Sequence, residues 1–246
     1  MIILHIETPY ASFRKSFARS FAESYSLPPP STIYGMLLSL VGEHFRKRHE
    51  GVRLAFAYKQ MPRIATTIRK LSRYKYGIPS KQSSLGNAPD FIETLCNIEF
   101  LCWIDSAQEK PDKNGDTKGA NLEQRLLTAL QNPQDITRRG IVCLGLSDDA
   151  VNDVSLCETI EENWHRLLPD GNIGLPLIDE NSQKPISWHR LLPNDKGSLE
   201  LPVWADHVKG FNTRWQRYDL EKEAPEMILP PDSGEWRWTK IVDPRK

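Results

Sequence analysis

The chain has 246 residues, with thirty-two basic and thirty-two acidic side chains, so its formal net charge is zero. Hydrophobic residues make up 39% and charged residues 26%, which is typical of a globular protein and not of a disordered or fibrous one. No apolar run approaches the ~20 residues of a membrane span, and the N-terminus has no basic segment or cleavage site of a signal peptide. We therefore expect a cytoplasmic protein without membrane partners.

The two parts of the chain carry opposite charge. Residues 1–81 hold fourteen Lys and Arg against four Asp and Glu, a net charge of +10, and residues 82–246 carry −10. A segregated basic segment is the expected footprint of a polyanion such as nucleic acid. The alternative is a basic face that meets the acidic half of the same chain.

The first 60 residues predict a strand, a helix and a second strand. Residues 1–8 favour a strand that Pro9 ends. After Pro28-Pro29-Pro30, Ser31 or Thr32 is a good helix N-cap, and apolar residues recur at helical spacing as far as Phe45. The predicted helix leaves through the basic run 46–48, and residues 52–59 form the next strand.

A basic excursion follows. Residues 61–94 have no helical periodicity and predict a two-stranded insertion. Residues 95–104 are a strand. Asn121 caps a helix over 122–130, and 141–146 form a short buried strand.

This order predicts an α+β fold: a ferredoxin-like (RRM-like) βαββαβ domain over residues 1–150, with an inserted β-hairpin at about 61–94. Residues 151–246 form an irregular, mostly-β C-terminal extension, including strand-like 199–204 and 236–242. The acidic stretch 148–168 suggests a helix.

Catalytic and metal signatures are missing from the sequence. None of the six histidines forms an H-x-x-x-H or H-E-x-x-H pattern. The acidic pair Asp148-Asp149 is interpreted as solvated. Four cysteines without C-x-x-C spacing predict unpaired core side chains and no zinc site. We therefore expect no catalytic residues, no metal and no cofactor.

The basic segment also alternates with aromatic residues. Single-stranded RNA is held by cations along its backbone and by aromatic faces under its bases, and residues 59–76, with Tyr58 beside them, supply both types. The start of the predicted helix near Ser31 adds backbone N–H groups that suit an anion.

The stretch from Pro9 to Glu43 contains a pattern that resembles a known protein family. It contains Ser12-Phe13-Arg14 and then Pro28-Pro29-Pro30-Ser31-Thr32-Ile33-Tyr34-Gly35. This pattern resembles the fifth CRISPR-associated (Cas) family of the RAMP superfamily, in its subtype B-like branch. The match covers roughly residues 1–150.

The resemblance implies a non-catalytic, RNA-binding subunit of a type I Cascade ribonucleoprotein complex. Such a subunit holds the 5′ handle of the CRISPR RNA (crRNA), contacts the Cascade backbone subunit through a hairpin "thumb", lies beside the large subunit, and serves RNA-guided targeting of DNA without reading that DNA itself. Family members act in antiviral defence and in CRISPR-associated transposons, and the sequence does not separate these uses. The acidic residues 148–170 either face a basic large subunit or transposition factor or form a solvated face.

Charge pattern and resemblance together predict a set of RNA-contacting residues. They are Ser12, Arg14, Lys15, Arg19, Ser31, Thr32, Tyr34, Arg46, Lys47, Lys59, Arg63, Arg69, Lys70, Arg73, Tyr74 and Lys75.

Two alternatives stay open. One branch of the family cleaves precursor crRNA without metal through Tyr, Lys and His, which here suggests Tyr34 and Lys47 with His44 or His49. The other is a generic protein-interaction module. Tail residues Trp204, Trp215, Trp236 and Trp238 are either interface anchors or core.

Overall fold

The computed structural model describes residues 1–16, 21–72, 87–110, 119–157, 166–167, 173–174, 187–205, 212–225, 231–232 and 236–244. Residues 69–72 and 87–90, which pair with each other at one end of the β4–β5 ribbon defined below, are described by their backbone only. Predicted contacts Arg19, Arg73, Tyr74 and Lys75 lie outside the described residues.

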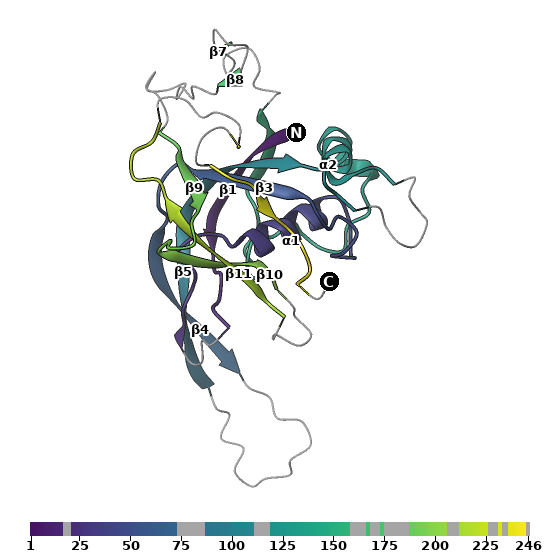
Figure 1. The fold of residues 1–246 in the computed structure, drawn as a ribbon. Coiled ribbons are helices and arrows are strands. Elements are labelled where there is room, and N and C mark those ends of the chain that lie inside the picture. Colours follow the sequence, from purple (N-terminus) through teal and green to yellow (C-terminus); the bar gives the residue numbers. More distant parts are fainter. Residues whose placement is uncertain are drawn as a thin grey trace.

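A central antiparallel sheet is built from strands far apart in the sequence. Its first part consists of β1 (Ile2–Ala11), β3 (Arg53–Tyr58), β5 (Asn87–Asp105) and β6 (Asp153–Leu156), in the spatial order β3-β5-β1-β6. Helix α1 (Pro30–Leu40) links β1 to β3, and α2 (Leu122–Gln131) precedes β6. The short 3₁₀ helix η1 (Pro133–Asp135) follows α2. The chain is therefore mostly antiparallel sheet with two α-helices among its described residues (Figure 1).

The C-terminal part adds strands to the same sheet. Strands β9 (His189–Pro193), β11 (Arg214–Leu220) and β10 (Leu199–Trp204) extend it beyond β3, and β12 (Thr239–Lys240) also pairs with β3. A separate ribbon joins β7 (Arg166–Leu167) and β8 (Ile173–Gly174). The predicted division near residue 150 stays a prediction about how the chain is organised.

A different hydrophobic cluster packs against each face of the sheet. Along β3, Leu54 and Phe56 join the cluster that contains α1 and α2, whereas Ala55 and Ala57 join a second cluster. The second cluster contains Trp188 and Trp236 from the tail, so Trp236 is core. Alternating strand residues thus bury both faces.

The predicted insertion forms a two-stranded ribbon. Strand β4 (Arg63–Ser72) pairs with the first half of β5, from Arg63 opposite Cys96 to Ser72 opposite Asn87, and short β2 (Phe21–Ala22) lies parallel on the other side of β5. In Figure 1 the β4–β5 ribbon extends away from the rest of the sheet. The two-stranded excursion within 61–94 is confirmed.

Several element boundaries differ from the sequence predictions. Strand β1 continues through Pro9 to Ala11, because β6 pairs only with Leu4–Glu7 and leaves the N–H side of Pro9 without a neighbouring strand. The predicted strand 141–146 is wrong: this segment has a single bridge, Cys143 to Ala150, and the strand beside β1 is β6. Part of the acidic stretch 148–168 is therefore strand and not helix.

Helix α1 also differs at both ends. Its N-cap position is Pro29, with Pro30 as first helical residue, so the prediction of Ser31 or Thr32 as cap is wrong. The helix ends at Leu40 and not in the basic run. Its last carbonyls accept hydrogen bonds from Arg125 and Arg138, through Val41 O at 3.0 Å and Leu40 O at 2.9 Å.

The predicted cap of α2 is confirmed. Asn121 Oδ1 accepts the Gln124 N–H at 2.9 Å, and the Gln124 side chain accepts the Asn121 N–H at 3.2 Å. All four cysteines are free, and Cys102 and Cys157 are buried as expected. None of the described helices has the length and apolar character that crossing a bilayer requires.

Candidate nucleic-acid interface

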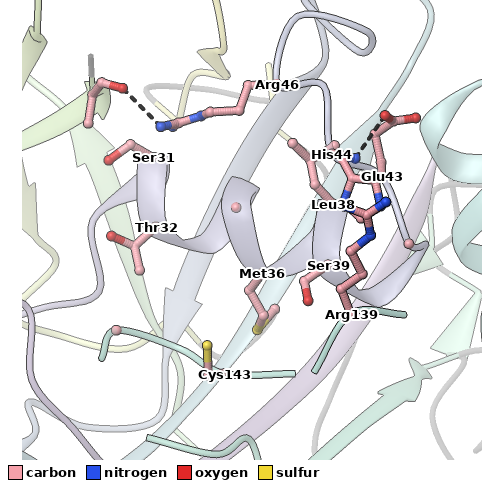
Figure 2. Close-up of a pocket in the computed structure, with 14 residues that line it drawn as sticks. Ser31, Thr32, Met36, Leu38, Ser39, Glu43, His44, Arg46, Arg139 and Cys143 are labelled. Carbon is pink, nitrogen blue, oxygen red and sulfur yellow. Dashed lines mark hydrogen bonds between the residues drawn. The ribbon is translucent and has the colours of Figure 1, made fainter. Parts of the chain in front are cut away.

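Two cavities meet at the start of α1. The larger, of about 500 Å³, runs along α1 and the segment after it, from Ser31 to His44, and the smaller, of about 280 Å³, lies beside Arg14 and Trp215. Both are lined by Ser31, Thr32, Gly145 and Ala205. We call the two together the α1 groove. Figure 2 shows its larger part, with Ser31 and Arg46 at one end and His44 and Arg139 at the other.

The first turn of α1 offers less to an anion than the sequence suggests. Pro30 has no N–H, and the N–H groups of Thr32 and Ile33 both donate to Pro29 O, at 2.9 and 3.0 Å. The hydroxyls of Ser31 and Thr32 face the groove, where Figure 2 shows both side chains. The helix start therefore contributes hydroxyl groups and the positive end of the helix dipole.

A glycine-containing loop forms the opposite wall. Gly145 has φ +114°, and a Cβ at this position would lie 2.7 Å from Ser12 O. Only glycine allows such a close approach with this backbone conformation. The loop thus packs directly on the turn that follows β1.

Asp149 holds this loop in place. Its Oδ2 accepts the N–H of Ser12 at 2.8 Å and the N–H of Leu146 at 2.9 Å, and its side chain is buried, with 3% exposure. The interpretation of Asp149 as solvated acid is therefore wrong, whereas Asp148 is exposed. The carboxylate is needed because two backbone donors at this junction lack a strand partner.

The structure brings some predicted residues to the groove. Arg14, Ser31, Thr32 and Arg46 line it. Arg46 is half-buried: its Nη1 donates to Ala205 O at 2.9 Å and its guanidinium lies 5.2 Å from the centre of the Trp204 ring. Ser12 also lines the smaller cavity, but its hydroxyl is buried against Thr94 Oγ1 at 3.1 Å and supports the wall.

The prediction that Tyr34 contacts RNA is wrong. Its ring is 0% exposed and its hydroxyl donates to Arg46 O at 2.6 Å, which contradicts the prediction that it contacts RNA. Burial raises the pKa of this phenol well above its ordinary value. The side chain therefore packs in the core and stays protonated.

Other predicted cations lie elsewhere and have carboxylate partners. Lys15 pairs with Glu23 at 3.1 Å, Lys47 with Asp243 at 2.9 Å, and Lys59 with Glu99 at 2.7 Å. None of these three lines the α1 groove. Lys47 and Lys59 thus pair with carboxylates of the acidic half, as the alternative interpretation of the charge anticipated, whereas Lys15 pairs within the basic half. Arg63 is exposed on the ribbon, where the backbone of Arg69 and Lys70 also lies.

The groove also contains residues that the sequence did not single out. Arg139 is exposed and lines the larger cavity, and Tyr25 and Trp215 line the smaller one. Arg139 follows a helix in a segment without periodicity, so no local signal marks it. Trp215 was one of four tail tryptophans without any feature to distinguish it.

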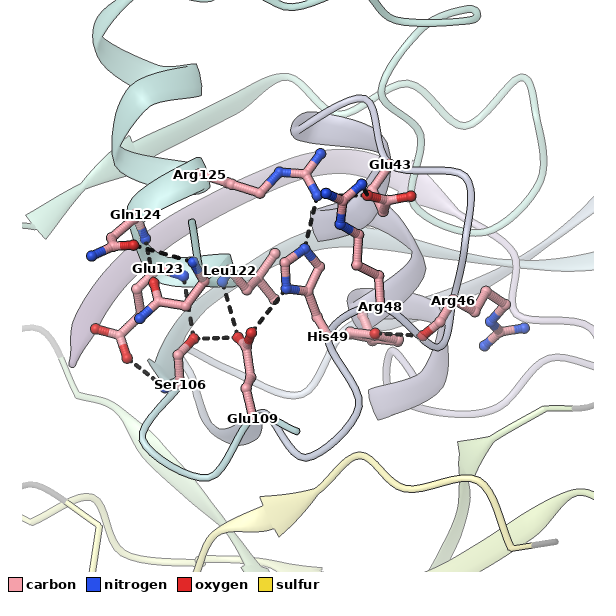
Figure 3. A network of polar contacts seen from close by, with 12 residues as sticks. Glu43, Arg46, Arg48, His49, Ser106, Glu109, Leu122, Glu123, Gln124 and Arg125 are labelled. Carbon is pink, nitrogen blue, oxygen red and sulfur yellow. Dashed lines mark hydrogen bonds and ion pairs between the residues drawn. The ribbon is translucent and has the colours of Figure 1, made fainter. Parts of the chain in front are cut away.

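His49 lies in a buried network at the far end of α1 (Figure 3). Arg125 donates to His49 Nε2 at 2.9 Å and to Glu43 Oε2 at 2.6 Å, and His49 Nδ1 lies 2.9 Å from Glu109 Oε2. Since Nε2 accepts, Nδ1 carries the proton and donates to Glu109. The ring is 2% exposed, so its role is to join the segment that follows α1 to α2. No metal-binding group of three His, Cys, Asp or Glu occurs within the described ranges.

Comparisons with known proteins identify the family of this chain. Residues 1–131 match the family model described as CRISPR-associated protein (Cas_Cas5). The chain is 36% identical over 233 residues to a protein named "CRISPR-associated protein Cas5" from Myxococcus xanthus (strain DK1622), covering 94% of this chain and 96% of the relative. The chain belongs to the Cas5 family of CRISPR-associated proteins.

One solved structure shares the fold over nearly the whole chain. A chain described as "CRISPR RNA-guided surveillance complex" superposes with a TM-score of 0.56 and 10% identity, over 96% of this chain and 95% of that one. A second, described as "Crystal structure of Cas protein", has a TM-score of 0.46 and 15% identity, over 92% and 95%.

Proposed function

We propose that this chain is the non-catalytic subunit of a type I Cascade complex that binds the 5′ handle of crRNA in the α1 groove. One observation carries the proposal: the Ser12–Arg14 turn, the proline-serine start of α1 and the Gly145 loop, which are separate in sequence, form the walls of one groove. Family membership and the fold shared with a chain of an RNA-guided surveillance complex support it.

Arg14 and Arg139 carry the electrostatic part of the proposal. Both are exposed and line different cavities of the groove, so a strand that runs along the length of the groove passes both. An arginine–phosphate pair is often bidentate and stronger than a neutral hydrogen bond. Each phosphate contact on a single strand contributes about 0.7 to the salt dependence of binding.

The framework of this proposal is a ferredoxin-like domain. The order β1-α1-β3-β5-α2-β6 and the sheet order β3-β5-β1-β6 support that interpretation. In this scheme the β4–β5 ribbon is the thumb that contacts the Cascade backbone subunit, and the large subunit lies alongside.

The apolar surface of the ribbon supports the thumb assignment. Ile68 lies opposite Phe91, and Phe91 lies beside Phe21 of β2, so the three side chains form a row across three strands. All three are exposed, with Ile68 at 67%. An apolar row on a protruding ribbon is typical of a surface covered by a partner.

The proposal is tested by guide retention in the assembled complex. Complexes are reconstituted with the wild-type chain, with Arg14→Glu plus Arg139→Glu, and with Lys196→Glu as a single charge reversal in the exposed β9–β10 turn, outside the groove. We expect the double variant to lose most of its crRNA and the control to keep it. Full crRNA occupancy in the double variant would refute handle binding in the groove.

Metal-free cleavage of precursor crRNA is the second candidate, and only one observation favours it. His44 is exposed and lines the larger cavity, whereas Tyr34 and His49 are buried. Incubation of the chain with repeat RNA in a chelator, with His44→Ala as comparison, separates the two functions. Discrete cleavage that the variant loses would replace the handle-binding proposal with this one.

A further inference from the structure

The smaller cavity of the α1 groove has an aromatic lining that handle binding through phosphates does not explain. The Tyr25 and Trp215 rings lie with centroids 6.0 Å apart and planes tilted by 55°. Trp215 is 36% exposed although it is a large apolar side chain on a strand. Arg14 and Thr32 line the same cavity.

Two distant parts of the chain place these rings together. Tyr25 follows β2, where its N–H donates to Phe13 O at 2.9 Å and Arg14 forms a bridge with Ser24. Trp215 lies on β11 opposite Pro202, where the β10–β11 register shifts between Pro202 and Trp204. Such an irregularity re-aims neighbouring side chains, and Pro202 and Trp215 both line the cavity.

The chemistry of the cavity fits one kind of group. Its volume, about 280 Å³, is at the small end of ligand-binding cavities, and its polar groups include the hydroxyls of Ser16, Thr32 and Thr213. An unstacked nucleobase combines a flat apolar face with a polar edge, and proteins hold such bases on aromatic rings. Phosphate has no flat face and gains nothing from Trp215.

Building on the proposed function, we propose that this cavity is a nucleobase subsite in which one base of the handle stacks on Trp215, beside Tyr25, with hydroxyl groups at its edge. Trp215 thereby gives the C-terminal part of the chain a direct role in RNA selection. The subsite holds a base, while Arg14 contacts the backbone next to it.

The two roles have different signatures in binding data. Loss of a stacking partner lowers affinity without removing a phosphate contact, so the salt slope stays unchanged. We expect Trp215→Ala to weaken handle binding about tenfold, and Trp215→Phe, which keeps an aromatic face, to weaken it about threefold or less. Arg14→Glu instead lowers the salt slope by about 0.7.

The experiment measures fluorescence anisotropy of the full-length chain with labelled handle RNA, and with a series of the same RNA carrying one abasic site each. The variants are Trp215→Ala, Trp215→Phe and, as a matched loss of an indole outside the groove, Trp238→Ala. We expect a single abasic position at which wild type and Trp215→Ala bind equally.

The following outcomes would each refute the proposed nucleobase subsite. Equal affinity of Trp215→Ala and wild type for intact RNA would leave handle binding standing and remove the base-stacking role. A uniform loss at every abasic position, or an equal loss in Trp238→Ala, would reduce Trp215 to structural support. If the wild-type chain binds no handle RNA, the proposed function fails and the subsite with it.

Discussion

The Asp149 junction gives the sharpest stability prediction. Replacing Asp149 with Ala removes the acceptor of two backbone hydrogen bonds, from Ser12 at 2.8 Å and Leu146 at 2.9 Å. Hydrogen bonds to a charged group contribute about 1.5–3 kcal/mol each. Water reaches the exposed loop in the variant and recovers part of this. We therefore expect the free energy of unfolding to fall by about 3 kcal/mol.

Thermal unfolding measures this loss. For a chain of this length, 1 kcal/mol shifts Tm by roughly 2–4 °C, so Asp149→Ala should lower Tm by about 6–12 °C. Asp148→Ala is the control, because the neighbouring aspartate is exposed, and its Tm should change by less than about 2 °C. The loss of Tm in Asp149→Asn, which keeps one side-chain oxygen as acceptor, should lie between the losses in Asp148→Ala and Asp149→Ala. Equal destabilisation by Asp148→Ala and Asp149→Ala would refute the role assigned to Asp149.

Three further predictions follow from local contacts. Burial alone would raise the pKa of Glu43, but hydrogen bonds from Arg125 and the Phe45 N–H outweigh it and lower that pKa. A carboxyl group with a lowered folded-state pKa stabilises the fold above its unfolded pKa, and this stabilisation is lost as the pH falls through the folded-state pKa. In urea titrations, Glu43→Gln should therefore destabilise the chain at about pH 7 and much less at about pH 3, whereas equal costs would contradict the linkage. Asn121→Ala should cost about 1 kcal/mol in the same assay through loss of the α2 cap, and an unchanged midpoint would contradict that. Ile68→Asp should reduce co-purification of the Cascade backbone subunit, with Ala65→Asp on the other face of β4 as control, and equal recovery of both would contradict the thumb assignment.

Elements with a strong periodic or capping signal could be predicted from the sequence. Strand β10 over 199–204 and helix α2 behind Asn121 both carry a local pattern, and both are confirmed. The ribbon was also predictable, because residues 61–94 lack a helical stripe and Thr66, Thr67 and Ile68 favour a strand. In these cases the local preference and the tertiary structure agree.

Features that depend on distant contacts could not be predicted. The segment 141–146 is apolar like a buried strand, yet Asp149 and Gly145 fold it as a loop against Ser12. Helix α1 loses its last predicted turn because Gly42 has φ +66°, outside the right-handed helical region, and a Cβ at this position would lie 2.4 Å from Thr137 O. The sequence does not reveal which acids and glycines meet the backbone of a distant segment.

The same limit applies to the groove. Sequence proximity suggested that Ser31, Thr32 and Tyr34 act together, but successive helical residues point in different directions and Tyr34 faces the core. Arg139 and Trp215 join the groove only through folding, from segments about 110 and 180 residues away from Thr32. Charge counting alone does not separate Lys59, which pairs with Glu99, from Arg14, which lines the groove.

Handle binding itself is tested most directly by comparing two RNAs. Affinity of the full-length chain for the handle RNA and for a shuffled RNA of the same length and composition is measured over a range of salt concentrations, for wild type and for Arg14→Glu plus Arg139→Glu. We predict that wild type prefers the handle and that the double variant has a salt slope lower by about 1.4, the value for two lost phosphate contacts. Equal affinity of wild type for both RNAs, with a slope that the double variant leaves unchanged, would contradict the account.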